Sequence, residues 1–334
     1  MHSDGADALG QLTIAITGAG GFLGRACVAE ARRRGLPVLA LYRNSLPGDW
    51  AGDAGITPLQ LDLTAPDAAD RLRAALPEDC AIIHAAAHLG DNLAAVARDT
   101  LSATRTLRDA WRDSDARLVL ISSLAVYDTD ALAPGDAVSE STPLIPLPDT
   151  PEQARDAYAG SKRLQEALFL DDLQDGWILR PGALWGPGRT WHALQGFRAS
   201  KLFVTIGSHG ELPLAHVDLC AQIAVEAART PTPGPGIVNV FDDDRPTRAR
   251  FLRAHRRCFG WPRLNVTVPY GAWLALVRLL KPISGNLPGL FRENILRARL
   301  MPLRYPNTRM RSAFPGEDID TFEGLMTRAA EDRG

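Results

Sequence analysis

The stretch that most constrains the fold is residues 12–24, where an apolar run breaks into three regularly spaced glycines, L-T-I-A-I-T-G-A-G-G-F-L-G. Gly18 permits a sharp turn out of a strand, Gly21 lets a ligand approach the backbone, and Gly24 lets the next helix pack closely. The N–H groups in the first turn of that helix have no partners within the helix, so they can bind the phosphates of a ligand. The pattern predicts a dinucleotide site; a plain glycine-rich turn is the alternative.

Strand and helix patterns alternate through the first half of the chain, which is typical of a parallel sheet with helices on both faces. We therefore predict an α/β fold, a Rossmann-type doubly wound parallel sheet with a smaller C-terminal substrate lobe. The expected strands are residues 12–16, 37–42, 58–61, 81–84, 117–121 and 177–179. The expected helices are 22–34, 66–76, 92–113 and 152–171. We assign 10–184 to the nucleotide-binding domain with a return to the sheet near 213–245, and 185–212 and 246–330 to the substrate lobe.

Composition excludes several classes of protein. Hydrophobic residues make up 46% and charged residues 23% of the 334, as in an ordinary soluble protein. A net charge of -2 gives no general attraction to nucleic acid. The four cysteines are far apart, so we expect reduced thiols and no metal site. The first eleven residues are polar and acidic, unlike an export signal, so we expect a cytoplasmic protein.

One apolar segment, residues 272–280, needs separate treatment because it resembles a membrane contact. It is about half the ~20 residues of a spanning helix, and Arg278 interrupts it. We predict a buried or pocket-lining helix, with a peripheral membrane contact as the less favoured alternative.

The ends of the expected strands carry candidate cofactor ligands. Arg43 ends the second strand, where an acidic residue would bind the ribose of NAD, and its guanidinium suits a 2′-phosphate. This favours NADP, with NAD or a solvated surface arginine as the alternatives. Asp62 follows the third strand and His84 closes the fourth, where we expect a structural hydrogen-bonding role. The small side chains of Ala85, Ala86 and Ala87 would let a cofactor pass.

The candidate catalytic residues follow the fifth strand. Ser122 and Ser123 stand at its carboxyl end, and Tyr158 and Lys162 lie four residues apart, on one face of an expected helix. An ammonium near a phenol favours the phenolate, so we expect Lys162 to lower the pKa of Tyr158. A chance Y-x-x-x-K in a helix is the alternative.

In order and spacing, T-G-A-G-G-F-L-G, I-S-S-L-A-V-Y, Y-A-G-S-K and R-P-G-A-L-W-G-P-G resemble the extended short-chain dehydrogenase/reductase family, also called the NAD-dependent epimerase/dehydratase family. The resemblance covers most of residues 10–245. It implies that Ser123, rather than Ser122, polarises the substrate oxygen, that Tyr158 transfers its proton, and that Lys162 also holds the nicotinamide ribose. It further implies a homodimer. We expect additional cofactor contacts from Phe22, Leu23, Leu63, Pro181, Gly182 and Leu184, and also from Tyr158 and Lys162.

Three positions depart from the family pattern. Thr100 stands where the family often has Asn, and the connection from Thr142 to Tyr158 is longer than usual, as in a lid or substrate wall. Ala183 stands where nucleotide-sugar members commonly carry a substrate-binding Asn. Alanine has no polar side-chain atom, so this favours an apolar substrate, which residues 273–280 would also suit.

Residues 292–311 contain six arginines and one acid. They suit either phosphate binding or a solvated helix that pairs with the acidic C-terminal segment.

We predict an NADP(H)-dependent oxidoreductase that acts on a secondary alcohol or ketone of a small molecule. A nucleotide-sugar epimerase or dehydratase with the same Ser-Tyr-Lys site is the alternative. A third class is a non-catalytic protein that senses nucleotides.

Overall fold

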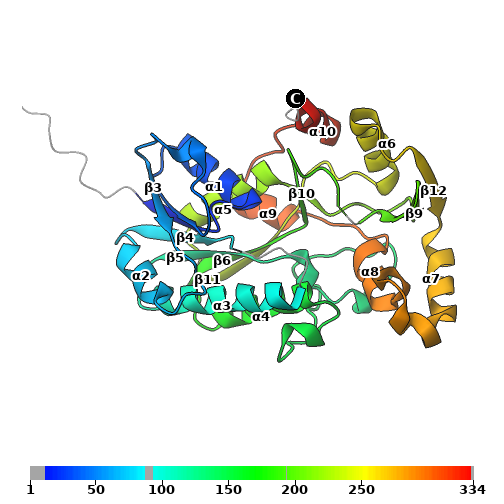
Figure 1. Ribbon diagram of the computed structural model, residues 1–334, viewed down its shortest axis with the longest axis horizontal. Coiled ribbons are helices and arrows are strands. Elements are labelled where there is room, and N and C mark those ends of the chain that lie inside the picture. The colour runs from blue at the N-terminus through cyan, green and yellow to red at the C-terminus, as the bar shows by residue number, and fades with distance from the viewer. Residues whose placement is uncertain (1–11, 87–92, 193, 332–334) are drawn as a thin grey trace, which may run out of the picture.

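The computed structural model describes residues 12–86, 93–192 and 194–331. Its centre is a parallel sheet of seven strands in the order β11-β6-β5-β4-β1-β2-β3, the Rossmann order, so the predicted fold class is confirmed (Figure 1). The strands of this sheet are β1 (Thr13–Thr17), β2 (Val38–Tyr42), β3 (Ile56–Gln60), β4 (Cys80–His84), β5 (Arg117–Ile121), β6 (Asp175–Pro181) and β11 (Gly234–Val240).

Each of the six predicted strands lies within two residues of an observed one, and β11 provides the expected return to the sheet. Alternate strand residues enter two different cores. Ile14 and Ile16 pack in a core with α1 and α5, while Ala15 packs in the core on the opposite face, with α2, α3 and α4 (Figure 1). These helices are α1 (Phe22–Arg33), α2 (Ala68–Ala75), α3 (Leu93–Trp111), α4 (Ala157–Leu170) and α5 (Val217–Arg229).

The fourth predicted helix begins later than expected, at residue 157 rather than 152. The chain forms a 3-10 turn at Pro151–Gln153, and Asp156 then caps α4 by accepting a hydrogen bond from the Ala159 N–H at 2.8 Å. A capping aspartate fixes the start of a helix because it satisfies an N–H with no partner inside the helix. Tyr158 therefore lies in the first turn of α4.

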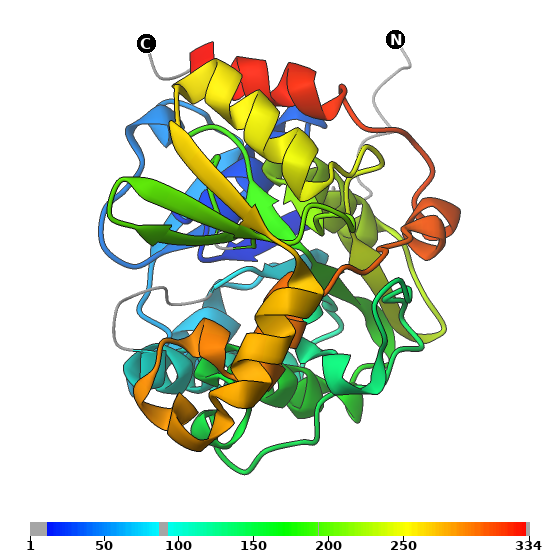
Figure 2. The same cartoon turned by 90° about the vertical axis from the view of Figure 1, so that its right-hand side faces the viewer.

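The outer part of the molecule contains two small sheets and the remaining helices (Figure 2). Strand β10 (Leu214–His216) pairs with β7 (Ala183–Trp185), and β9 (Leu202–Ile206) lies between β8 (Gly196–Ala199) and β12 (Leu264–Val268). The remaining helices are α6 (Arg248–Phe259), α7 (Tyr270–Leu279), α8 (Glu293–Leu300), α9 (Thr308–Ala313) and α10 (Phe322–Glu331). Of these, α9 packs on β11 of the main sheet, where Met310 enters the core that α1 and α5 share.

Helix α7 covers the apolar segment for which we predicted a buried or pocket-lining helix. Trp273 and Val277 are buried in the outer core, but Leu276 and Leu279 are 37% and 77% exposed. α7 contributes no described residue to the crevice discussed below, and its buried residues pack in the outer core instead. Apolar composition does not tell which side of so short a helix is covered. Among the described residues, no helix has the length and apolar character needed to cross a bilayer.

Candidate active site

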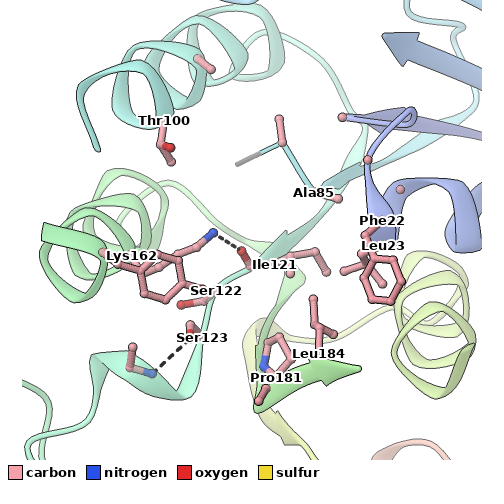
Figure 3. Close-up of a pocket in the computed structure, with 18 of the residues that line it drawn as sticks. Phe22, Leu23, Ala85, Thr100, Ile121, Ser122, Ser123, Lys162, Pro181 and Leu184 are labelled. Carbon is pink, nitrogen blue, oxygen red and sulfur yellow. Dashed lines mark hydrogen bonds between the residues drawn. The ribbon is translucent and has the colours of Figure 1, made fainter. Parts of the chain in front are cut away.

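A crevice of about 830 Å³ opens at the carboxyl ends of the sheet strands, where ligands bind in open α/β sheets (Figure 3). One end is formed by the glycine turn between β1 and α1 and by the ends of β2, β3 and β4. The other end is formed by the residues after β5, the start of α4, the residues after β6 and part of α8. The size falls within the roughly 300–1,000 Å³ of small-molecule pockets.

The glycine turn has the geometry that a pyrophosphate needs. Gly18 has φ +66°, and a Cβ there would lie 2.8 Å from the Ala86 Cα. A Cβ on Gly24 would lie 2.1 Å from the Gly18 carbonyl oxygen, so the helix can approach the strand only with glycine there. Gly21 precedes α1 without a side-chain cap, and the first turn of α1 has no acid. Its N–H groups and dipole therefore suit an anion.

All but one of the predicted cofactor residues line this one crevice. Those contributed by the glycine turn and the strand ends are Gly18, Gly21, Phe22, Leu23, Gly24, Arg43, Asp62, Leu63, Ala85, Ala86, Pro181, Gly182 and Leu184. Ala87 lies outside the described residues.

Two of these residues define their part of the crevice in more detail. Asp62 accepts hydrogen bonds from the Thr64 N–H at 2.9 Å and the Thr64 hydroxyl at 2.8 Å, which fixes the turn after β3. Gly182 has no room for a side chain, since a Cβ would lie 2.1 Å from the Pro213 carbonyl oxygen.

Ser123, Tyr158 and Lys162 come together in the crevice from β5 and α4. The Ser123 hydroxyl accepts from the Ala125 N–H at 3.1 Å and lies close enough to Tyr158 to lower the pKa of its hydroxyl. Lys162 Nζ donates to the Ile121 carbonyl at 2.9 Å (Figure 3). This leaves the ammonium two further donors beside the crevice.

Burial dominates the electrostatics of the pair. Tyr158 is 37% exposed, on the side of the crevice. Burial of its hydroxyl nevertheless raises the pKa of that group, because a charged phenolate is less stable away from water. The neighbours that lower this pKa are Ser123 and Arg189. Lys162 is not among them, so the lowering that we expected from Lys162 stays a prediction. Burial lowers the pKa of Lys162 to about 8, against the opposing effect of Glu166.

Ser122 has a different role from its neighbour. Its hydroxyl donates to Glu166 Oε1 at 2.5 Å, and Glu166 forms a buried two-point ion pair with Arg180, at 2.8 and 2.7 Å. Arg180 Nη1 also donates to the Tyr127 hydroxyl at 3.1 Å. This network ties α4 to β6 beneath the crevice. Sequence reasoning quoted Arg180 and Tyr127 only as parts of motifs and missed Glu166, whose position eight residues after Tyr158 was the available signal.

His84 is buried away from the crevice, in agreement with the structural role that we expected. Its Nδ1 lies 2.7 Å from the Thr17 hydroxyl, and its Nε2 lies 3.1 Å from the Thr104 hydroxyl. Burial, reinforced by the charge of Lys162, lowers its pKa to about 3. A neutral imidazole with both nitrogens occupied cannot shuttle protons at physiological pH.

The end of the crevice beyond Tyr158 contains residues that sequence reasoning did not select. Arg155, Arg189 and His192 line it, together with Arg299 of α8. Among the described residues of the long connection before Tyr158, Arg155 and Asp156 line the crevice. Arg189 directly follows the quoted G-P-G and could have been found from that position.

The six arginines of residues 292–311 serve different purposes. Arg299 lines the crevice, whereas Arg311 pairs with Asp243 at 2.6 Å and with Asp318 of the acidic C-terminal segment at 3.1 Å. Arg297 pairs with Asp130 at 3.2 Å. The pairing with the acidic C-terminal segment is therefore found for Arg311, and phosphate binding by the segment stays a prediction.

Comparison with known proteins places this geometry in a family. The model of the NAD dependent epimerase/dehydratase family matches residues 14–225. A 3-diazoavenalumate denitrifying reductase from a Streptomyces species is 28% identical over 269 residues, 75% of this chain and 83% of that protein. The ceramide reductase of Caulobacter vibrioides is 28% identical over 283 residues, 83% of this chain and 81% of that protein.

Solved structures share the fold at lower identity. The UDP-N-acetylglucosamine 4-epimerase of Bacillus cereus superposes with a TM-score of 0.66 at 18% identity, covering 97% of this chain and 100% of that chain. This likeness agrees with the seven-stranded Rossmann sheet and shows the fold alone.

Proposed function

Because the chain belongs to the NAD dependent epimerase/dehydratase family, we propose that it is an NADP(H)-dependent oxidoreductase acting at a secondary alcohol or ketone carbon. The observation that carries this proposal is that Ser123, Tyr158 and Lys162 line the same crevice as the glycine turn. A cradle for a dinucleotide and a phenol that can donate a proton in the same crevice are what hydride transfer to a carbonyl requires.

A bound nicotinamide dinucleotide would supply the hydride that reduces the carbonyl carbon. Tyr158 donates its hydroxyl proton to the carbonyl oxygen, and the raised pKa keeps that proton in place at neutral pH. Ser123, which lines the crevice beside Tyr158, donates to the same substrate oxygen. Lys162 is held by the Ile121 carbonyl and offers its remaining donors to the cofactor ribose.

Two observations favour a net reductase over an epimerase. Both curated relatives described above carry the name reductase and match at least three quarters of this chain. Ala183 also lines the crevice with no polar side-chain atom at the position where nucleotide-sugar members commonly carry Asn. The epimerase alternative draws its support from Arg189 and Arg299, which could bind an anionic carrier.

We propose that the substrate ketone belongs to a largely apolar molecule. The crevice has an apolar lining near the arginines, formed by Leu124, Leu194, Pro213 and Ala298. These residues, and not those of α7, support an apolar substrate. Such a lining buries an apolar body while a few polar groups fix its orientation.

NADP is the cofactor that we favour over NAD. Arg43 lines the crevice at the end of β2, where the adenosine ribose binds in Rossmann proteins. An exposed guanidinium at this position suits the two extra charges of a 2′-phosphate.

The test is NADPH absorbance with Tyr158→Phe and the wild-type protein against apolar ketones and nucleotide sugars. We expect wild type to consume NADPH with a ketone, and Tyr158→Phe to lose roughly 10²- to 10⁴-fold in turnover while cofactor still binds. Tyr270→Phe is the control, since its buried hydroxyl has no hydrogen-bond partner among the described residues and lies outside the crevice. Conversion of a nucleotide sugar without net cofactor consumption would instead establish the epimerase.

A further inference from the structure

A second cavity, of about 410 Å³, lies in the outer part of the molecule between α6 and the sheet that contains β9 and β12. In Figure 2 the yellow helix α6 leads into β12, which runs beside β9. The described residues that line this cavity include none of those that line the crevice. It is therefore a separate site.

Three arginines form the helical side of this cavity. Arg253, Arg256 and Arg257 are spaced i, i+3 and i+4, so all three lie on one face of α6. All three are exposed to solvent at this face. Like charges at these spacings repel one another, so this arrangement costs the free protein stability unless an anion lies between them.

Hydroxyl and amide groups form the strand side. Thr205 of β9 is opposite Thr267 of β12, and alternation along β12 places Asn265 on the same face. The Thr205 hydroxyl, 1% exposed, donates to Asn265 Oδ1 at 2.7 Å. This contact directs the Asn265 amide so that its N–H donors stay available. Ser208 completes the wall.

The charges of the cavity are not neutralised within the described part of the chain. No carboxylate lines it, and none of its three arginines forms an ion pair there. Arg256 donates through Nε to the Pro262 carbonyl at 2.8 Å, which leaves its other N–H groups. By contrast Arg250, on the same helix, pairs with both Asp244 and Glu323.

We propose that this cavity, which we call the α6 arginine site, binds a phosphate group of a small molecule or lipid. Guanidinium forks match the oxygens of a phosphate, and hydroxyl and amide donors complete its hydrogen bonds. The volume exceeds that of a phosphate ion, so a phosphate ester fits.

Two sources share this chemistry. One is a soluble phosphate ester; the other is the headgroup of an anionic phospholipid. Leu264 and Val266 are 58% and 49% exposed, but they lie on the face of β12 opposite Asn265 and do not line the cavity.

The experiment measures binding to the full-length protein with NADP at saturation, so that phosphates do not bind at the cofactor end of the crevice, and the variants below separate the α6 arginine site from the crevice arginines. Calorimetric titration uses inorganic phosphate and glycerol 3-phosphate. Co-sedimentation uses phosphatidylcholine vesicles with and without phosphatidylglycerol. The variants are Arg253→Gln/Arg257→Gln and, as the matched control, Arg263→Gln, an exposed arginine outside the cavity.

We expect the double variant to bind at least about tenfold more weakly than wild type, since each lost charge-assisted contact is worth roughly that much. Arg263→Gln should bind like wild type. Binding of the soluble phosphates supports a small-molecule source, and binding only of phosphatidylglycerol vesicles supports a headgroup. The proposal is overturned if wild type binds neither probe, or if the double variant binds as well as wild type while its circular dichroism is unchanged.

Discussion

Replacing Lys162 by methionine should make the folded protein more stable at neutral pH while removing its activity. Lys162 is 4% exposed, and burial lowers its pKa from 10.5 to about 8. At about 1.4 kcal/mol for each factor of ten, this difference means that folding disfavours the ammonium by about 3 kcal/mol at pH 7. Methionine has a similar length and no charge to bury.

The gain is reduced by one lost contact. Lys162 Nζ donates to the Ile121 carbonyl, and a charge-assisted hydrogen bond of this kind contributes about 1.5 kcal/mol. We therefore expect Lys162→Met to raise the free energy of unfolding by about 1–2 kcal/mol at pH 7.

The pH dependence distinguishes this cause from better packing. Because the pKa of Lys162 is lower in the folded state, the unfolded chain binds more protons between about pH 8 and 10.5. Burial of the charged Lys162 therefore lowers the free energy of unfolding of the wild type below pH 8. This loss disappears as the pH rises through that window and the lysine becomes neutral. The advantage of the variant should therefore shrink towards pH 10.

The assay is urea unfolding of the cofactor-free proteins at pH 7 and pH 10, followed by circular dichroism. Lys201→Met, at an exposed lysine, is the control and should change stability little at either pH. If Lys162→Met is less stable than wild type at pH 7, or keeps the same advantage at both values, the reasoning about burial of the ammonium is refuted.

Three further predictions concern the cofactor turn and the buried network. Arg43→Asp should weaken NADPH binding by about tenfold or more and NADH binding much less, as measured by fluorescence titration; equal losses would make Arg43 a bystander. Glu166→Gln leaves the buried Arg180 guanidinium without its charge partner, so urea unfolding should show a loss of about 3–5 kcal/mol, and a loss below 1 kcal/mol would contradict this. Gly24→Ala places a Cβ 2.1 Å from the Gly18 carbonyl oxygen and should weaken binding of both cofactors together, whereas loss of only one would point elsewhere.

Most of the main sheet could be predicted from sequence because its inner strands are buried on both faces, although β3 at its edge is partly exposed. After Arg117, residues 118–121 are continuously apolar and form a run that is bounded by a loop and too short for a helix, so the strand matched residue for residue. The glycine turn was equally readable, since Gly18 and Gly24 each meet a steric limit that other residues cannot satisfy.

Other features depend on information that the local sequence does not contain. The Glu166–Arg180 pair requires the packing of α4 against β6, which sets the register between two distant segments. Helix α7 is apolar on its buried and on its exposed side, so its sequence does not show which side is covered. The raised pKa of Tyr158 depends on the density of the surrounding protein, which a Y-x-x-x-K spacing does not report.

The order of the strands also limits how the molecule can move during turnover. After β6 the chain leaves the main sheet for β7, β8 and β9, returns through β10 and α5 to β11, and leaves again for α6. The outer elements are thus tethered to the sheet by several covalent crossings instead of one hinge. A wide swing would have to strain all of these tethers at once, so we expect the crevice to admit its ligands by loop and side-chain adjustments. For the same reason, a chimaera that exchanges the outer elements needs several junctions, and a single cut would divide the core of the sheet.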